Sequence, residues 1–126
     1  MCSSNPEVRR PSNEESGLLQ WLLQKDFQDV EELRAQLDGI LVESIDDDGS
    51  IRLYPQKGSP AGFAGLAPVE GRYEDADGIT VSLLIHLRNG FLHELEIYKD
   101  DSTFIALRPA EAPTLRYATA RPLGWS

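Results

Sequence analysis

The chain has 126 residues, a net charge of −9 and an ordinary globular composition, so one folded domain is expected. The acidic surplus repels phosphate backbones and anionic lipids, which excludes nucleic acid and membrane surfaces as leading partners. One cysteine, Cys2, cannot form an internal disulfide, and no apolar stretch approaches the ~20 residues that span a bilayer, so we expect a cytoplasmic protein.

The start of the chain predicts an arm followed by a helix. Residues 1–11 are polar and contain two prolines, which favours a flexible arm. Ser12 and Glu15 have the spacing of a capping box. Leucines then recur at three- and four-residue intervals, so a helix is expected over residues 12–25.

A second helix and a hairpin are predicted next. Asp29 and Glu32 repeat the capping spacing, and Gly39 is placed to end the helix. The following segment is rich in β-branched residues, and turn formers divide it at residues 47–50. We therefore expect a hairpin over residues 40–54.

The remaining segments alternate between strands and irregular chain. Prolines and glycines predict a long loop at residues 55–68, which is the kind of loop that often carries function. A short strand is expected at residues 69–73 and a last strand at residues 103–107, before a C-terminal tail of residues 108–126. The expected fold class is α+β in one domain of residues 12–107, with two N-terminal helices packed on a mainly antiparallel sheet of about five to six strands.

The strongest signal is the hairpin around Asn89 and Gly90. A two-residue turn would place Glu94 and Glu96 among the apolar residues of the other strand. A three-residue loop of residues 88–90 gives one face that is apolar apart from His93. Because burying an unpaired carboxylate is costly, we expect the three-residue loop with a bulge at Gly90. The expected cross-strand pairs are Leu87 with Phe91, Ile85 with His93, Leu83 with Leu95 and Val81 with Ile97.

The other face of this hairpin carries the candidate binding site. Glutamates two apart on a strand point the same way, so Glu94 and Glu96 can act as acid and base or hold a cation. The alternative is a solvated face whose charges pair with Arg88 or Lys99. The expected binding face consists of Ser82, His86, Glu94, Glu96 and Tyr98.

No catalytic residue, cofactor or metal site is expected. In the chosen register His86 and His93 face opposite sides of the sheet, and two histidines without a cysteine pair make a thin case for zinc. The acidic segments 46–49 and 75–78 are interpreted as turns. Cys2 has no neighbouring base, so a catalytic role is not expected.

Two segments, residues 77–81 and 90–98, resemble a family of small uncharacterised bacterial proteins. Its members open with a pattern like Arg10-Pro11-x-x-Glu14 and close with a Gly-x-Leu-x-Glu-Leu-Glu-Ile-Tyr hairpin. The resemblance would span Arg10 to Leu107 and marks the two glutamates of the hairpin. The resemblance implies a domain of unknown function and does not point to any particular activity.

The expected function is a non-enzymatic protein-binding module, with an immunity-type inhibitor as its narrowest form by analogy. This expectation rests on the small size of the chain, an acid surplus concentrated before residue 81 and the lack of a recognisable catalytic set. The acid surplus indicates a basic protein partner. The alternative is a small enzyme or ligand-binding domain that uses the Glu94 and Glu96 face with the 55–68 loop as a lid. Either a monomer or a homodimer fits the sequence.

Overall fold

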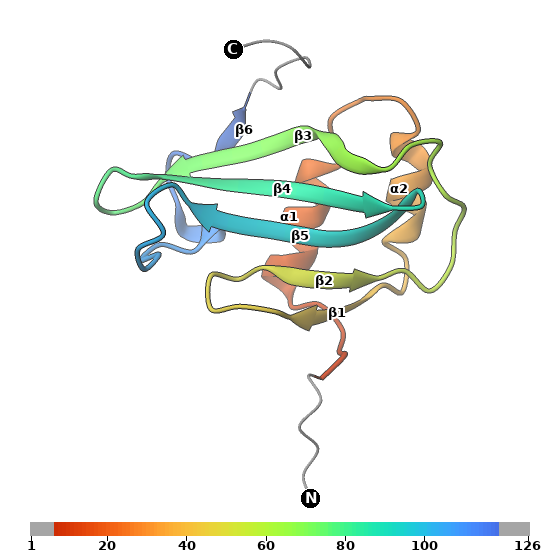
Figure 1. Ribbon diagram of the computed structural model, residues 1–126, viewed down its shortest axis with the longest axis horizontal. Helices are drawn as coiled ribbons and strands as arrows, with labels where there is room; N and C mark the ends of the chain where they lie inside the picture. Colours follow the sequence, from red (N-terminus) through yellow and green to blue (C-terminus); the bar gives the residue numbers. More distant parts are fainter. Residues whose placement is uncertain (1–6, 119–126) are drawn as a thin grey trace, which may run out of the picture.

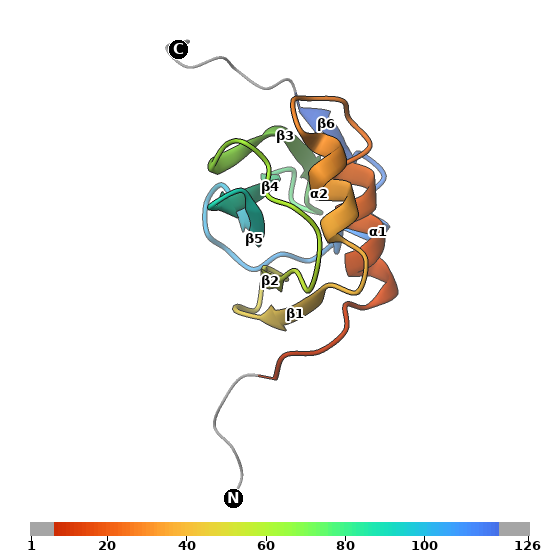
Figure 2. The ribbon, with the colours of Figure 1, turned by 90° about the vertical axis from the view of Figure 1, so that its right-hand side faces the viewer.

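The computed structural model describes residues 7–118, in which two helices cover one face of a six-stranded sheet (Figure 1). All strand pairs are antiparallel, in the order β1-β2-β5-β4-β3-β6. Turned by 90°, the helices form one layer and the sheet the other (Figure 2). The expected α+β fold with two N-terminal helices is confirmed. Its elements are α1 (Asn13–Leu22), α2 (Val30–Gln36), β1 (Leu41–Ser44), β2 (Ile51–Tyr54), β3 (Gly65–Glu74), β4 (Thr80–Arg88), β5 (Phe91–Lys99), the short 3-10 helix η1 (Pro109–Glu111) and β6 (Arg116–Ala118).

The two helix starts differ. The capping box of α1 is confirmed, because the Ser12 hydroxyl accepts from the Glu15 amide and the Glu15 carboxylate accepts from the Ser12 amide. The second expected capping box is wrong: Asp29 has a φ of 64° and makes no side-chain cap. Its carboxylate instead accepts a hydrogen bond of 2.8 Å from the Gly62 amide, so it anchors the loop after β2.

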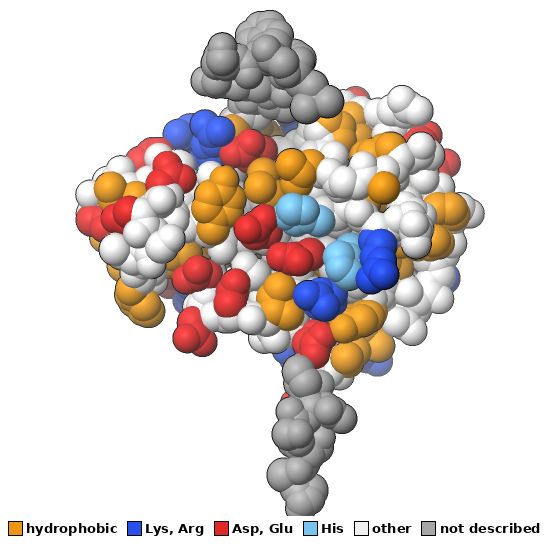
Figure 3. Space-filling view, viewed as in Figure 1, with side chains coloured by type: hydrophobic (Ala, Val, Ile, Leu, Met, Phe, Trp, Pro, Cys, Tyr) orange, Lys and Arg blue, Asp and Glu red, His pale blue; other side chains and the backbone are white. Residues whose placement is uncertain are grey.

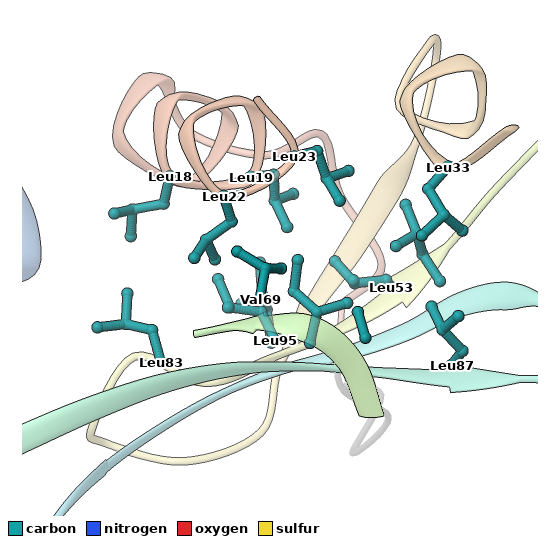
Figure 4. Close-up of a cluster of buried hydrophobic side chains, with 14 of the residues drawn as sticks. Leu18, Leu19, Leu22, Leu23, Leu33, Leu53, Val69, Leu83, Leu87 and Leu95 are labelled. Carbon is teal, nitrogen blue, oxygen red and sulfur yellow. The ribbon is translucent and has the colours of Figure 1, made fainter. Parts of the chain in front are cut away.

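The core lies between the helix layer and the inner face of the sheet (Figure 4). Leucines of α1 point at strand residues such as Leu83 and Leu95, both of which are fully buried. Burying a leucine side chain contributes roughly 1.5–3 kcal/mol relative to leaving it exposed, so this cluster holds the two layers together. None of the helices within residues 7–118 has the length and apolar character needed to cross a membrane.

The third strand is longer than expected. It begins at Gly65 rather than Val69, which shortens the irregular loop to residues 55–64. Pro68 is exposed and lies where the ladder between β3 and β4 is irregular, between Leu66 and Glu70. A proline at such a position removes no regular ladder hydrogen bond, so it does not end the strand.

The expected strand at residues 103–107 is wrong. The amides of Ala106 and Leu107 donate to the Asp75 carboxylate instead of to a neighbouring strand. The last strand is β6, which pairs with β3 and lies within the segment expected to be a tail. It is fixed to the helix layer by Tyr117, whose ring stacks on Trp21 with 4.1 Å between centroids.

Near the N-terminus, Arg9 belongs to the segment expected to be an arm. It forms an isolated β-bridge with Val42, and its guanidinium contacts the Glu15 carboxylate at 2.8 Å. Residues 1–6 and 119–126, and with them the expectation about Cys2, lie outside the described part of the chain.

Candidate functional site

The β4–β5 hairpin turns through two residues, so the expected three-residue loop is wrong. Asn89 and Gly90 both have positive φ, 55° and 83°, as a tight hairpin turn requires. A Cβ on Gly90 would lie 2.3 Å from the Ala61 carbonyl oxygen, so the loop after β2 packs directly against this turn. The bulge lies at His93 rather than at Gly90, because Leu87 pairs with Leu92 while His86 pairs with Glu94.

This bulge shifts the expected cross-strand partners but not the faces of the two glutamates. From Val81 to His86 the partners lie two positions later than expected, and the partner of Leu87 lies one position later, so the predicted pairs are wrong. Because this shift of two keeps the side of the sheet, Glu94 and Glu96 stay on the expected face, where they now lie opposite His86 and Leu84, away from the buried Leu83. The carboxylates therefore avoid the core although the turn has only two residues. The observed pairs include Ile85 with Leu95, Leu83 with Ile97 and Val81 with Lys99.

The residues beside the bulge change sides. Leu92, which strict alternation along the strand would place on the same side as Glu94, is 1% exposed and belongs to the core. His93, expected on the apolar face, is half-buried on the open face of the sheet, where Figure 3 shows both histidines of the chain. The prediction that His86 and His93 face opposite sides is therefore wrong. The extra residue in β5 causes both changes.

The open face is the side of the sheet that the helices leave uncovered (Figures 2 and 3). Directly paired residues form one row across five strands, in the order Glu43, Arg52, Glu94, His86 and Leu66. Acidic and basic groups alternate in this row until it ends at Leu66, which is 52% exposed. The Nε atom of Arg52 is buried and has no hydrogen-bond partner among the described residues.

His86, Glu94 and Glu96 form a compact cluster in the middle of this face. His86 Nε2 lies 2.7 Å from Glu96 Oε1, and one ligand atom from each of the three side chains lies within 4.8 Å of the others. The side chains of His86 and Glu96 are 34% and 37% exposed, so the cluster is open to water. Burial, followed by the positive charges of Arg52 and Arg88, lowers the pKa of the neighbouring His93.

The other two residues of the expected binding face, Tyr98 and Ser82, differ in solvent exposure. Tyr98 is 38% exposed and presents an aromatic ring at the surface. Ser82 is only 3% exposed, because it lies between the longer side chains of Tyr98 and Arg72 on the adjacent strands. Ser82 therefore offers little surface to a partner.

Aspartates gather at the end of the sheet where β1, β3 and β5 end. They lie in two turns and in the segment after β5, at the left of Figure 1. We call this group the acidic end; it consists of Asp46, Asp47, Asp48, Asp75, Asp77, Asp100 and Asp101.

The acidic end contains a buried network that the sequence did not reveal. Lys99 Nζ donates to Asp75 Oδ2 at 2.9 Å and to Asp77 Oδ2 at 2.7 Å. The Asp75 carboxylate also accepts from the amides of Ala106 and Leu107, so it does more than shape a turn. Neither Lys99 nor these amides share its sequence neighbourhood, and no local pattern could have found them. Because its ammonium group pairs with these aspartates, Lys99 does not pair with the glutamates of the open face, as the alternative interpretation of that face required.

A hollow of about 250 Å³ lies beside the acidic end, between the start of α1, the β1–β2 turn and η1. Its apolar lining includes Leu18 and Ile105, and its charged lining includes Asp47 and Asp48 together with Glu14 and Arg108, which form an ion pair at 3.7 Å. Burial, and then the charges of Asp46 and Asp47, raise the pKa of Asp48. Two larger hollows on the described surface lie along α1, α2 and the start of β1, away from the open face.

Comparison with known proteins places the chain in a family. A family model described as a domain of unknown function, DUF6984, matches residues 8–109. The chain belongs to the DUF6984 family. The match runs from the segment that bridges β1 to the start of η1, close to the span of Arg10 to Leu107 expected from the sequence. No curated protein and no solved structure matched the chain.

Proposed function

We propose that this DUF6984 protein is a non-enzymatic binding module that engages a basic protein through its open sheet face and the adjoining acidic end. The observation that carries the proposal is a sheet face left uncovered by both helices, with charged side chains at its centre (Figure 3). Tyr98 and Leu66 add apolar surface to it, being 38% and 52% exposed. Exposed aromatic residues are typical anchors of protein interfaces.

The charge of this surface favours a cationic partner. Glu94 forms no ion pair with any residue from 7 to 118, and Glu96 contacts only His86 among the ion pairs of that region. Asp47, Asp48 and Asp100 add negative charge at the acidic end without an ion pair in the same region. Such a field accelerates association with a basic protein and weakens as salt increases.

The hollow beside the acidic end fits a side chain of the partner. Its 250 Å³ is below the usual range of roughly 300–1,000 Å³ for small-molecule pockets, but sufficient for a lysine or arginine side chain. The aliphatic stem would lie against Leu18 and Ile105, and the cationic head would meet Asp47 and Asp48. A toxin that itself binds nucleic acid presents this kind of basic surface, so an immunity-type inhibitor is the narrowest form of the proposal.

The geometry gives less support to an enzyme. The side chains of His86 and Glu96 are open to water, whereas acid–base catalysis usually takes place in a concave, partly desolvated site. The loop expected to act as a lid is tied elsewhere: Ala61 donates to the Gly90 carbonyl, and Gly62 donates to Asp29. These contacts hold the loop at the hairpin turn and α2, away from the two glutamates.

The test is quantitative affinity capture from the source cell with a matched pair of variants. Glu94→Arg/Glu96→Arg reverses two charges on the open face, and Glu31→Arg/Asp38→Arg makes the same change in net charge at exposed positions in and after α2. We expect the wild type and the α2 control to capture a basic protein. The open-face variant should capture at least about tenfold less of it.

Two results would contradict the proposal. In one, both variants lose the partner equally, which would indicate an effect of net charge alone. In the other, the open-face variant retains it. Capture is repeated at low and moderate salt in the presence of a chelator, so that metal ions do not affect the outcome.

A further inference from the structure

The cluster of His86, Glu94 and Glu96 has the composition and spacing of a three-ligand metal site. We propose that these side chains bind a zinc ion on the open face of the sheet. Zinc is held in proteins by histidine nitrogen and carboxylate oxygen, and a site with three protein ligands keeps a further position for water or another ligand. The proposal goes beyond the protein-binding function and does not depend on it.

The hairpin places the three ligands on one surface. His86 and Glu94 are direct cross-strand partners, and Glu96 lies two residues further along β5, on the same side as Glu94. The bulge at His93 creates this arrangement, since without the extra residue Glu94 would lie opposite Ile85. Bulges that re-aim side chains are common beside functional sites.

The distances suit an ion at the centre of the cluster. Zinc lies ~2.0–2.2 Å from nitrogen and carboxylate ligands, which puts tetrahedral ligand atoms about 3.5 Å apart. The ligand atoms of the cluster already lie within 4.8 Å of one another, and those of His86 and Glu96 are 2.7 Å apart. Small side-chain rotations therefore suffice, and the backbone can stay as it is. Zinc binding requires the imidazole tautomer with its proton on Nδ1, or loss of one proton from the protonated ring to water, so that the Nε2 lone pair binds zinc in place of the hydrogen bond to Glu96.

The chemistry of the ligands selects the ion. Magnesium and calcium prefer all-oxygen ligand sets, whereas an imidazole nitrogen favours zinc and its transition-metal neighbours. Some of the surrounding charges favour cation binding and others oppose it. Glu94 has no ion pair within residues 7–118, but it lies opposite Arg52, whose positive charge weakens cation binding. We therefore expect a site of moderate affinity.

The test is calorimetric titration of the full chain with zinc chloride, without an affinity tag and in a Cys2→Ser background that removes the thiol. We expect one zinc ion per chain, and we expect His86→Gln, Glu94→Gln and Glu96→Gln each to weaken binding at least about tenfold. His93→Gln is the matched control, because His93 is the other histidine of the same face and lies outside the cluster. This control should bind zinc as the wild type does.

Spectroscopy gives a second readout that does not depend on affinity alone. Cobalt(II) in place of zinc should produce the visible absorption of a low-coordinate nitrogen and oxygen site, and Glu94→Gln should abolish it. Magnesium at the same concentration should not displace cobalt. The proposal is overturned if the wild type binds no more zinc than a variant that combines His86→Gln, Glu94→Gln and Glu96→Gln, or if His93→Gln removes binding while Glu94→Gln does not. A thermal unfolding profile for each variant establishes that loss of binding is not loss of fold.

Discussion

Lys99 and Asp75 form an ion pair in which Nζ lies 2.9 Å from Oδ2 and both side chains are almost completely buried. Lys99 also donates to the Phe104 carbonyl, and Asp75 accepts from the amide of Leu107. The network therefore joins the β3–β4 turn, the end of β5 and the segment after it. The Lys99 ammonium, followed by the Ala106 amide, holds the pKa of Asp75 well below its usual range.

Loss of this ion pair should change how stability depends on pH. Because the native pKa of Asp75 is lowered, its contribution is fully present above the unfolded aspartate pKa of about 3.9 and is lost as the pH falls below that value. We expect Asp75→Asn to be clearly less stable than the wild type near neutral pH, with the difference shrinking in acid.

Urea unfolding monitored from about pH 7 down to about pH 3 checks this. Asp100→Asn is the control, because Asp100 is exposed and its side chain makes no hydrogen bond or ion pair among residues 7–118. A difference between Asp75→Asn and the wild type that stayed constant over the whole range would contradict the assigned pKa direction.

Gln36 should hold the hairpin turn against the end of α2. Its side chain is fully buried; Nε2 donates to the carbonyls of Ser59 and Gly90, and Oε1 accepts from the Leu92 amide at 2.8 Å. Gln36→Leu keeps the volume but removes the partner of the Ser59 carbonyl and of the Leu92 amide, whereas the Gly90 carbonyl keeps its hydrogen bond from Ala61. We therefore expect a loss of ~1–3 kcal/mol in the free energy of unfolding.

Two measurements test the role of Gln36. Denaturant unfolding gives the free energy, and hydrogen exchange should show a faster-exchanging Leu92 amide. Gln20→Leu on the exposed side of α1 should change stability by less than about 0.5 kcal/mol. Unchanged exchange at Leu92 in Gln36→Leu would show that the hydrogen bond to Oε1 does not protect it.

Neighbouring leucines of β4 should respond differently to truncation. Leu83 is fully buried on the inner face, whereas Leu84 lies opposite Glu96 on the open face and is half-buried. We expect Leu83→Ala to cost ~2–5 kcal/mol and Leu84→Ala less than about 1.5 kcal/mol. Chemical denaturation of the two variants decides this, and equal losses would mean that the faces of β4 are wrongly assigned.

Local patterns predicted the parts of the fold that depend on local physics. The capping box of Ser12 and Glu15, the β1–β2 hairpin and the alternation along β4 each arise from residues close together in the sequence. The face of Glu94 and Glu96 was also predictable, because burying two unpaired carboxylates is costly whichever register the hairpin adopts.

Long-range contacts explain what the sequence could not show. The Asn89-Gly90 pair is itself typical of a two-residue turn; what the sequence did not show is the bulge at His93, which keeps the glutamates off the core and brings the histidines to one face. The Asp75 carboxylate accepts hydrogen bonds from amides that residues 103–107 would need for pairing with a neighbouring strand. A regular hairpin pattern contains no sign of the bulge, and the Asp75 contacts depend on amides about 30 residues away in the sequence.

The most direct test of the open face as the binding surface is photo-crosslinking from two positions. A benzophenone-bearing phenylalanine analogue replaces Tyr98 on the open face or Gln20 on the exposed side of α1. We predict a crosslink to a basic protein from position 98, its loss in the Glu94→Arg/Glu96→Arg background, and none from position 20. A crosslink from position 20 instead, or one from position 98 that survives the charge reversal, would contradict the account.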